Sequence, residues 1–472
     1  MQSDCCNSVN SIWSLHGYTK TLEEAVALAL NTGTQLCYEC HLQEQDAVLA
    51  AVANGDVNQS TLDAAVARML LTRFRHGEFD AKHPWSHVTS DQIDTPAARA
   101  LAREAAGKTV VLATNVGGVL PIKSARLAKM KVAVIGPFAD CGAACYVHSY
   151  GPTPSYHSSY LNATRQHVPT AAFSDGTNLT NATLAAAAAS DLIILCLGIG
   201  QAESEGTDRL NLTFAPAQLE LWSAVRKASS PSTTLILISA SGGGVSFNST
   251  VEAQADAILL AGYGGQEAGN GALDVITGAL NPSARLPLTV YGTEYLSQVG
   301  PESNFSSTSG VGRTYRYLDS DASPPVFRFG YGLSFAQFRY SNLIVSPSTV
   351  MAPAPATAPA TALLLSAVDV SVAVTNAGSV DGAEIVQIYV AVPPVAGLPT
   401  PRWSLQGFAK VLIRANETKR VEFQLNASQL STVLHDGSSK VLPGTYTVHA
   451  GGGQPGDPRA QSKCVSGTLH LA

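Results

Sequence analysis

The sequence predicts a multidomain protein that combines α/β and all-β domains. Two patterns support this prediction. Between residues 109 and 334, short continuous apolar runs alternate with helical stretches, as expected of strands buried on both faces of a mostly parallel sheet. From residue 335 to residue 472, apolar and polar residues alternate and turn residues recur, which is typical of a β-sandwich.

Residues 1–82 are expected to form short strands and helices, followed by a linker over residues 83–108. Thr21-Leu22-Glu23-Glu24 is a capping box, in which the Thr21 hydroxyl accepts a bond from the Glu24 amide while the Glu24 carboxylate reaches back. A second helix is predicted over residues 60–74. One face of this helix carries Leu62, Val66, Met69 and Leu70.

The predicted parallel strands are the apolar runs 132–136, 192–197, 235–238 and 257–260. Helical stretches over residues 216–227 and 268–277 lie between or after them. This alternation predicts an α/β sandwich of the doubly wound type over residues 109–334.

The all-β region begins with a low-complexity stretch, residues 352–361, which we expect to be a disordered surface loop. Alternating valines at positions 368 to 374 and alternating apolar residues at positions 386 to 390 follow it. Asn376-Ala377-Gly378 and Pro443-Gly444 mark turns. The spacing favours an immunoglobulin-like or fibronectin type III-like sandwich.

Composition excludes several classes of function. The chain carries 29 basic and 35 acidic residues, a net charge of −6, and only 14% of its residues are charged. No basic face indicates nucleic-acid binding. No apolar run reaches the ~20 residues of a membrane helix.

The glycosylation pattern Asn-x-Ser/Thr is frequent, which indicates a secreted protein of the extracellular space, cell wall or vacuole. No signal peptide follows Met1, as expected if an N-terminal part is missing. The alternative is coincidence in a chain rich in Ser and Thr. The candidate acceptors are Asn58, Asn162, Asn178, Asn181, Asn211, Asn248, Asn304, Asn416 and Asn426.

Eight cysteines are too few for a disulfide scaffold of this length. The Cys37–Cys40 and Cys141–Cys145 pairs have no His-rich partner segment, so we predict no metal site and favour isolated structural bridges. Cys196 lies in an apolar run and is expected to be a buried free thiol.

Six short segments carry a further signal: 3–5, 16–21, 205–209, 262–269, 281–287 and 329–334. In this order and spacing they resemble glycoside hydrolase family 3, in the branch of β-xylosidases and α-arabinofuranosidases. The resemblance implies that residues 1–82 are the C-terminal remnant of a (β/α)₈ barrel of the TIM type, most of which is missing. It also implies an α/β sandwich over 109–334 and a fibronectin type III-like domain over 335–472. The chain departs from the family pattern at Gln35, Thr114, Ala284 and Arg328.

The same resemblance implies the catalytic residues. Asp4 would be the nucleophile of a retaining glycosidase and Glu205 its general acid/base, with Glu203 as a rival for the second role. Gln35 and Arg209 are weaker candidates for contacting the sugar, and an ion-paired structural role for Asp208-Arg209 is the favoured alternative. No cofactor is implied. The long Gly-rich run 262–269 lacks the order of a phosphate loop and is read as a tight strand-to-helix turn.

Cys5 and Cys37 would follow adjacent barrel strands, so a disulfide between them is implied, with two unpaired thiols as the alternative. In the pentosidase branch such a bridge would narrow the pocket where a hexose places its hydroxymethyl group. It would therefore favour xylose or arabinose over glucose.

The expected function is hydrolysis of terminal β-xylosyl, or α-arabinofuranosyl, residues of xylan-type oligosaccharides, impaired here because the barrel is incomplete. The partner is thus an oligo- or polysaccharide. Two alternatives stay open: an inactive remnant that binds carbohydrate or a partner, and a β-glucosidase of the same family. Residues 1–80 are expected to be poorly packed, because barrel helices need their sheet to bury against.

Overall fold

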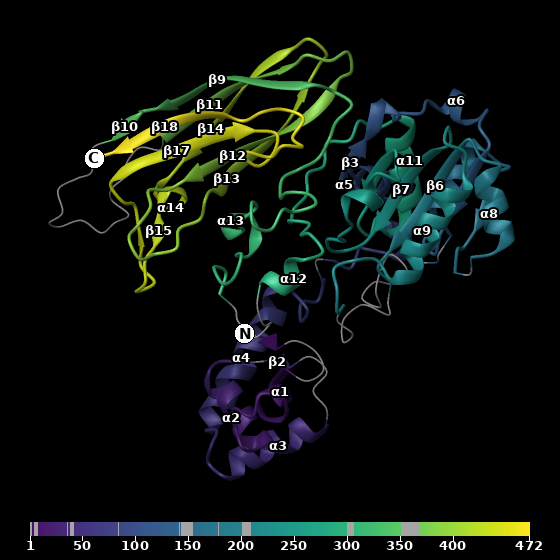
Figure 1. Ribbon diagram of the computed structural model, residues 1–472. Helices are drawn as coiled ribbons and strands as arrows, with labels where there is room; N and C mark the ends of the chain where they lie inside the picture. The colour runs from purple at the N-terminus through teal and green to yellow at the C-terminus, as the bar shows by residue number, and fades with distance from the viewer. Residues whose placement is uncertain are drawn as a thin grey trace. The chain divides into compact units, whose positions relative to one another are not determined.

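The computed structural model describes residues 2–3, 8–34, 36–37, 42–83, 85–140, 142, 154–177, 179–200, 209–299, 306–350 and 368–472. The chain divides into two compact units, Met1–Thr95 and Pro96–Ala472 (Figure 1). None of the described helices is long and apolar enough to cross a membrane.

The first unit contains the short strands and helices that the sequence predicts. Strands β1 (Gln2–Ser3) and β2 (Leu36–Cys37) pair in parallel, with Ser3 opposite Cys37. The Thr21 hydroxyl accepts the Glu24 amide, but the Glu24 carboxylate reaches one residue further back than expected, to the Lys20 amide at 2.7 Å. The helices are α1 (Ser8–Ser14), α2 (Leu22–Asn31), α3 (Leu42–Ala53) and α4 (Gln59–Arg75), followed by the 3₁₀ turn η1 (Ser90–Gln92).

Small side chains dominate the core of this unit. Alanines of α2 and α3 pack with Val9, Val26 and Val57 in two small clusters. All residues of α4 are described, and only Ala65 among them is buried. Of the predicted apolar face, Leu62, Met69 and Leu70 are half-buried and Val66 is 48% exposed, so this face is only partly covered.

The second unit contains the predicted doubly wound sheet. Its order is β3-β8-β7-β6-β4-β5, with all neighbours parallel except β3 against β8. The chain runs outward from β4 to β5 and then returns to place β6 on the other side of β4, so the strand order reverses between β4 and β6. The strands are β3 (Val111–Asn115), β4 (Val132–Ile135), β5 (Ala172–Ser174), β6 (Leu192–Gly198), β7 (Thr234–Ala240) and β8 (Ala257–Leu260).

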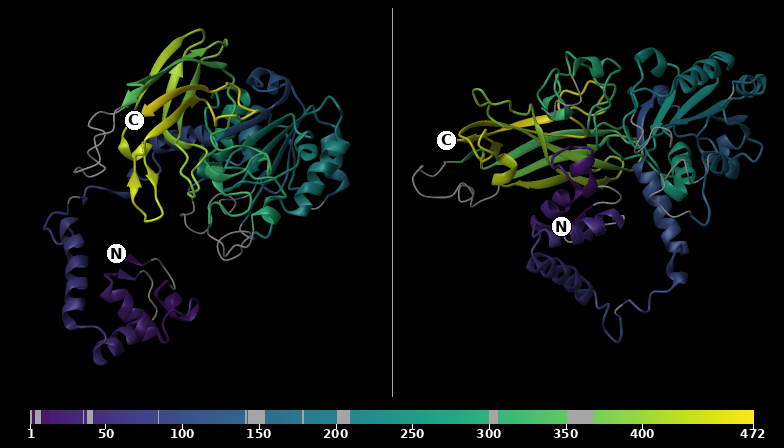
Figure 2. Two further views of the ribbon diagram at one scale, coloured as in Figure 1. Left: turned by 60° about the vertical axis from the view of Figure 1, so that its left-hand side comes forward. Right: turned by 90° about the horizontal axis from the view of Figure 1, so that it is seen from below.

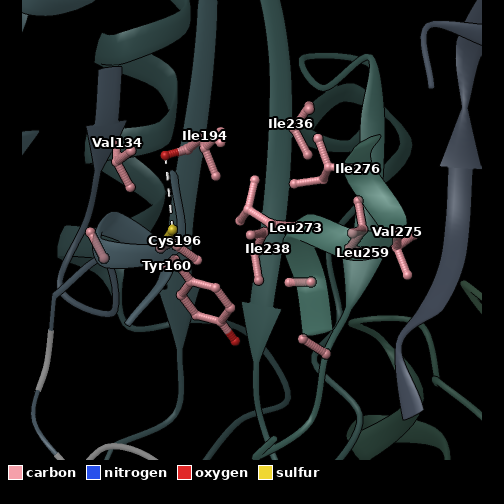
Figure 3. Close-up of a cluster of buried hydrophobic side chains, with 14 of the residues drawn as sticks. Val134, Tyr160, Ile194, Cys196, Ile236, Ile238, Leu259, Leu273, Val275 and Ile276 are labelled. Atoms are coloured by element: carbon pink, nitrogen blue, oxygen red, sulfur yellow. Dashed lines mark hydrogen bonds between the residues drawn. The ribbon is translucent and has the colours of Figure 1, made fainter. Parts of the chain in front are cut away.

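Each face of this sheet carries its own core. Helices α7 (Tyr160–His167) and α11 (Ala268–Thr277) cover one face, and α8 (Asn181–Ala188) and α9 (Pro216–Ala228) cover the other. Figure 3 shows part of the first core. Cys196 lies within it as a free, fully buried thiol whose pKa is raised by burial, which confirms the prediction.

The predicted linker 83–108 is wrong at its C-terminal end, because helix α5 (Pro96–Thr109) packs on α11. The crossing is close: a Cβ on Gly271 would lie 2.5 Å from the Gly107 nitrogen. The helix escaped prediction because alanine and glycine supply its packing surface, which leaves little apolar periodicity to detect. Shorter elements are η2 (Val116–Gly118), α6 (Ser124–Leu127), α10 (Ser249–Glu252), η5 (Gly265–Glu267), α12 (Tyr295–Gln298) and α13 (Thr314–Tyr317).

The C-terminal part is the predicted β-sandwich, drawn in green to yellow (Figure 2). Its sheets have the orders β10-β18-β17-β12-β13 and β14-β11-β9. The four alternating valines of β11 are fully buried between them, which confirms the period-two pattern. Residues 352–361 lie outside the described residues. The strands are β9 (Phe338–Ser346), β10 (Thr349–Val350), β11 (Val368–Asn376), β12 (Gly382–Ala391), β13 (Ser404–Ile413), β14 (Thr418–Leu425), β17 (Gly444–Gly451) and β18 (Val465–Leu471). A short helix α14 (Ala427–Leu430) and a ribbon of β15 (Thr432–Val433) and β16 (Ser439–Lys440) complete the domain.

The α/β domain and the β-sandwich are packed together within the second unit. The Arg285 guanidinium bonds to the Glu384 carboxylate at 2.6 Å and to the Gly452 carbonyl at 2.9 Å. The Gln387 amide donates to the Gly330 carbonyl at 2.9 Å. These polar contacts join residues 57 to 167 positions apart, so the two domains share a partly buried interface within one compact unit.

Candidate functional site

The reversal of strand order marks the carboxyl ends of β4 and β6 as the place to search, since open α/β sheets bind ligands at such a point. Two glycines bring the backbones together there. A Cβ on Gly136 would lie 2.2 Å from the Cys196 carbonyl oxygen, and one on Gly198 would lie 2.2 Å from the Ala240 carbonyl oxygen. Neither position could carry a side chain without moving a strand.

Most of the residues predicted to act chemically lie outside the described residues. These are Asp4, Cys5, Gln35, Glu203, Glu205 and Asp208. For Cys37 the backbone of β2 is described but not the side chain. The roles of these residues and the Cys5–Cys37 bridge therefore stay predictions. The described positions next to them are Ser3, which ends β1, and the two flanks of the segment 201–208.

The residues before segment 201–208 are held by side chains from α9 and from the turn after β8. The Gln218 amide accepts from the Gly198 nitrogen at 2.9 Å and donates to the Gly198 carbonyl at 2.8 Å. The Tyr263 hydroxyl donates to the Ile199 carbonyl at 2.7 Å. The backbone is thus fixed up to two residues before the segment that contains Glu203 and Glu205.

Arg209 fixes the residues that follow segment 201–208. Its Nη2 donates to the Gly244 carbonyl at 3.1 Å, in the glycine-rich turn after β7. Its Nη1 is buried without a partner in the described part of the chain. Among the described residues Arg209 therefore contacts a backbone carbonyl, and its predicted ion pair and sugar contact both stay untested.

An open cavity of about 400 Å³ lies at the same edge of the sheet, at the carboxyl ends of β7 and β8. The turn 241–244 and Tyr263 form part of its wall, and apolar residues such as Val111 and Val290 complete it. The Tyr263 ring lies so close to the turn that a Cβ on Gly242 would come within 2.7 Å of it. Sequence reasoning missed Tyr263, which lies inside the Gly-rich run 262–269.

The run itself is the predicted strand-to-helix turn, with positive φ at Gly262 and at Gly265, the first residue of η5. Glu267 within it is 4% exposed. Its carboxylate accepts from the Tyr156 hydroxyl and from the Asn270 amide, the latter at 2.6 Å. Burial raises the pKa of Tyr156. This carboxylate is committed to internal hydrogen bonds, so it is a structural group rather than a second candidate acid.

No three His, Cys, Asp or Glu side chains within the described ranges are grouped as a metal site would require. Seven of the nine candidate glycosylation acceptors are described, and all seven are exposed: Asn58, Asn162, Asn181, Asn211, Asn248, Asn416 and Asn426. Asn178 and Asn304 lie outside the described residues.

Comparison with known proteins identifies both domains of the second unit. Residues 110–335 match the glycosyl hydrolase family 3 C-terminal domain, and residues 384–454 match the fibronectin type III-like domain. A probable exo-1,4-beta-xylosidase of Aspergillus clavatus is 32% identical over 97% of this chain and 59% of its own length. A beta-xylosidase/alpha-L-arabinofuranosidase of Medicago sativa subsp. varia is 30% identical over 94% of this chain and 60% of its own length.

Solved structures give the same picture of the fold. A family 3 exo-beta-xylosidase, solved with a xylobiose aziridine probe, superposes with a TM-score of 0.83 at 25% identity and covers 100% of this chain and 61% of its own. A beta-glucosidase from Listeria innocua, solved with glucose, has a TM-score of 0.80 at 22% identity. The match covers 100% of this chain and 62% of the Listeria chain. This chain thus spans about three fifths of the length of the relatives that it matches.

Proposed function

The chain belongs to glycoside hydrolase family 3, and on this premise we propose that it hydrolyses terminal non-reducing β-xylosyl residues of xylan-type oligosaccharides. Terminal α-arabinofuranosyl residues are a second substrate of the same site. The observation that carries the proposal is the extent of the likeness to the xylosidases, which reaches across 97% of the chain.

In the proposed mechanism, the Asp4 carboxylate attacks the anomeric carbon while Glu205 gives its proton to the leaving oxygen. A covalent glycosyl-enzyme results. Glu205 then takes a proton from water, which displaces Asp4 and releases the sugar with retained configuration. Such a mechanism needs the two carboxyl groups ~5–5.5 Å apart and no cofactor.

Two features of the described residues support these assignments. Asp4 directly follows β1, which is paired in parallel with β2, so the backbone that presents it begins at a hydrogen-bonded strand end. The segment containing Glu205 follows β6 and is tethered at both flanks, through Gln218 and Tyr263 on one side and Arg209 on the other. Tethered flanks favour the fixed geometry that a catalytic group needs.

The choice of a pentose is supported by the xylosidase relatives and by the strand register. Ser3 lies opposite Cys37, and Cys5 follows Ser3 by two residues in the sequence. A Cys5–Cys37 bridge is therefore part of the proposal, as the element that excludes a hexose. A β-glucosidase is the second candidate, favoured by the fold likeness to the Listeria enzyme.

An inactive binding protein is the third candidate. The observation in its favour is that α4 buries only Ala65 completely and leaves its apolar face partly covered. A catalytic aspartate without a rigid support loses much of its rate, because small displacements of a reacting group are costly.

Turnover of aryl β-xylosides and of xylobiose by the purified chain tests the proposal. Asp4→Ala should abolish both activities. Glu205→Gln should lower xylobiose turnover by about 10²–10⁴-fold. With aryl groups that leave without protonation, it should spare the first step and slow the second, so that a burst of the aryl alcohol precedes slow turnover. Glu203→Gln is the matched control and should retain activity. Proton NMR should show β-xylose as the first product.

Turnover that survives Asp4→Ala would overturn the assignment of the nucleophile. A faster reaction with aryl β-glucosides than with aryl β-xylosides would favour the second candidate. No turnover of either substrate by a folded chain would favour the third.

We further propose that the protein is a secreted glycoprotein. The exposure of all seven described acceptor asparagines supports this localisation, because a glycan can be attached only at an accessible side chain.

A further inference from the structure

We propose that the peptide bond between Asp457 and Pro458 is a self-cleavage site, which the Asp457 side chain breaks in mildly acidic solution. The bond lies in the loop that joins β17 to β18, and it is the only Asp-Pro bond in the sequence. An aspartyl carboxyl is a nucleophile that can reach the carbonyl carbon of its own residue. Proline is a good leaving group there, because its nitrogen belongs to a tertiary amide. The proposal uses none of the residues assigned to glycoside hydrolysis.

Two consecutive turns meet at this bond. The Asp457 N–H donates to the Gln454 carbonyl at 3.2 Å, which closes a turn with Gly456 at a φ of 70°. The Asp457 carbonyl then accepts the Ala460 N–H at 3.3 Å, which closes a second turn that begins with the Asp-Pro bond. The carbonyl that would be attacked is therefore already polarised by a backbone donor.

The Asp457 side chain is folded over the same bond. Its Oδ1 accepts the Arg459 N–H at 2.9 Å, two residues further along the chain. This contact requires the side chain to lie back over the peptide bond that follows it. Its Oδ2 is buried and has no partner among the described residues. One carboxyl oxygen thus fixes the side chain beside the scissile carbonyl, and the other is not committed to a hydrogen bond.

The second turn is anchored on the α/β domain. The Arg459 guanidinium binds both carboxylate oxygens of Glu252, at 2.6 and 2.9 Å. It also lies over the Phe327 ring, 5.0 Å from its centre. Two residues later, the Gln461 amide donates to the Ser334 carbonyl at 3.1 Å. These contacts restrict the motion of the turn, and a fixed geometry accelerates a reaction between groups that are already adjacent.

The surroundings favour the protonated form of the carboxyl. Burial raises the pKa of Asp457, against the opposing influence of the Arg459 backbone and of the Arg328 and Arg459 guanidinium groups. The acid form therefore persists at a pH at which an exposed aspartate has lost its proton. Three further titratable neighbours stay uncharged in acid, because burial raises the pKa of each. They are Tyr331, Tyr389 and Cys464.

In the proposed step, a carboxyl oxygen of Asp457 forms a bond to the carbonyl carbon of the same residue. The carboxyl proton passes to the Pro458 nitrogen, the C–N bond breaks, and Pro458 leaves as a secondary amine. The five-membered cyclic anhydride that remains on Asp457 takes up one water, which restores two carboxyl groups. Pro458 is exposed, so water can reach this site. Overall, a peptide bond and one water become a carboxylic acid and an amine.

The cleaved chain should stay folded. Strand β18 pairs with β17 over seven residue pairs and with β10 over two. Leu469 of β18 is fully buried in the core of the β-sandwich. The fragment 458–472 would therefore remain bound, and cleavage would leave a nicked protein rather than a shortened one.

Incubation of the purified chain at pH 5 and 37 °C, followed by mass spectrometry under denaturing conditions, tests the proposal. The expected products are residues 1–457 and 458–472, which should elute together from a size-exclusion column before denaturation. Cleavage should be about tenfold or more faster in the folded chain than in the same chain unfolded in urea, because only folding holds the carboxyl over the bond. The rate should fall as pH rises, since the step needs the carboxyl proton.

Three variants separate this chemistry from folding and from contaminating proteases. Asp457→Asn keeps an acceptor for the Arg459 N–H but has no acid proton, so cleavage should be lost. Pro458→Ala replaces the leaving group with a secondary amide and should slow cleavage about tenfold. Asp436→Asn changes an aspartate in another turn of the β-sandwich and should leave the rate unchanged. Thermal unfolding checks that each variant is folded.

Equal rates in the folded and the urea-unfolded chain would reveal only the ordinary acid lability of an Asp-Pro bond and would overturn the proposal. Cleavage that persists in Asp457→Asn would assign the cut to a protease and would overturn it too. A folded wild type that stays intact while the unfolded chain is cleaved would show that the fold protects the bond. None of these measurements depends on glycosidase activity, so they test the site independently of the proposed function.

Discussion

Arg285 of the α/β domain and Glu384 of the fibronectin type III-like domain form an ion pair at 2.6 Å, with side chains only 7% and 1% exposed. The Tyr340 hydroxyl donates to the second carboxylate oxygen at 2.6 Å. Burial raises the pKa of Glu384, against the opposing influence of Arg285 and Tyr340. A carboxylate in such surroundings is tolerated because each of its oxygens has a partner.

Removing one partner of this pair should strongly destabilise the second unit. Glu384→Gln and Arg285→Met are each expected to lower the free energy of unfolding by about 3–5 kcal/mol, because the remaining group is left buried without its partner. Replacing both together by Met and Leu should cost less than either single change. Urea unfolding measures these differences.

The same experiment tests whether the two domains unfold together. Hydrogen exchange of β7 and of β12 should respond equally to Glu384→Gln. Loss of protection in β12 alone would show that the β-sandwich opens separately and that the interface couples the domains weakly.

Asp457 should destabilise the protein at neutral pH. Its Oδ2 is buried without a partner, and burial raises its pKa in spite of Arg328 and Arg459 nearby. The folded state therefore holds the proton more tightly than the unfolded state, so stability falls as pH rises from about 4, the unfolded pKa, through the folded pKa. Asp457→Asn, which keeps an acceptor for the Arg459 amide, should be more stable than the wild type at pH 7 and show no gain at pH 3.

Asp436 is the matched control, because its pKa is shifted in the opposite direction from that of Asp457. Its pKa is lowered by hydrogen bonds from the Ser438 side chain and backbone, so it stabilises the fold above pH 4 and this contribution is lost as pH falls. Asp436→Asn should therefore be less stable than the wild type at pH 7 and equal to it in acid. Thermal unfolding across pH 3 to 8 compares the two variants. Parallel pH profiles would contradict both assignments.

The sequence predicts what local patterns encode. The apolar runs that became β4, β6, β7 and β8 are continuous because both faces of their sheet are covered, and the alternation of β11 reflects a sandwich. Contacts between distant residues leave no such pattern. The Arg285–Glu384 ion pair joins residues 99 positions apart, and the Tyr263–Ile199 hydrogen bond joins residues 64 positions apart. Neither the interface between the two domains nor the cavity wall could therefore be predicted.

Gly198 should be intolerant of any side chain. A Cβ there would lie 2.2 Å from the Ala240 carbonyl and 2.9 Å from the Phe138 ring, so Gly198→Ala must separate β6 from β7. We expect a loss of about 1–3 kcal/mol or more in urea unfolding, as for overpacked cores. Gly243→Ala is the control, because its nearest neighbour would be the Arg209 guanidinium at 3.9 Å. Equal stability of the two variants would be inconsistent with this close approach.

Glycan attachment at the acceptor asparagines should be compatible with the local structure. Asn211, Asn248 and Asn426 use their side-chain oxygens as acceptors, for Thr213, Val251 and Gln429 respectively. A glycan is joined to the side-chain nitrogen, which takes part in none of these bonds. Secretion from a eukaryotic host, followed by enzymatic deglycosylation and peptide mass spectrometry, should therefore find these sites modified.

Substitution separates the glycan from the cap. Asn248 and Asn426 are the N-cap residues of α10 and α14, so replacement by Ala should cost about 0.5–2 kcal/mol even in unglycosylated protein from bacteria. Asn58 precedes α4 without a side-chain cap bond, so Asn58→Ala should change the stability of the bacterial protein much less. A chain that is secreted by the eukaryotic host but carries no glycan at Asn211, Asn248 and Asn426 would argue against the proposal that the protein is a glycoprotein.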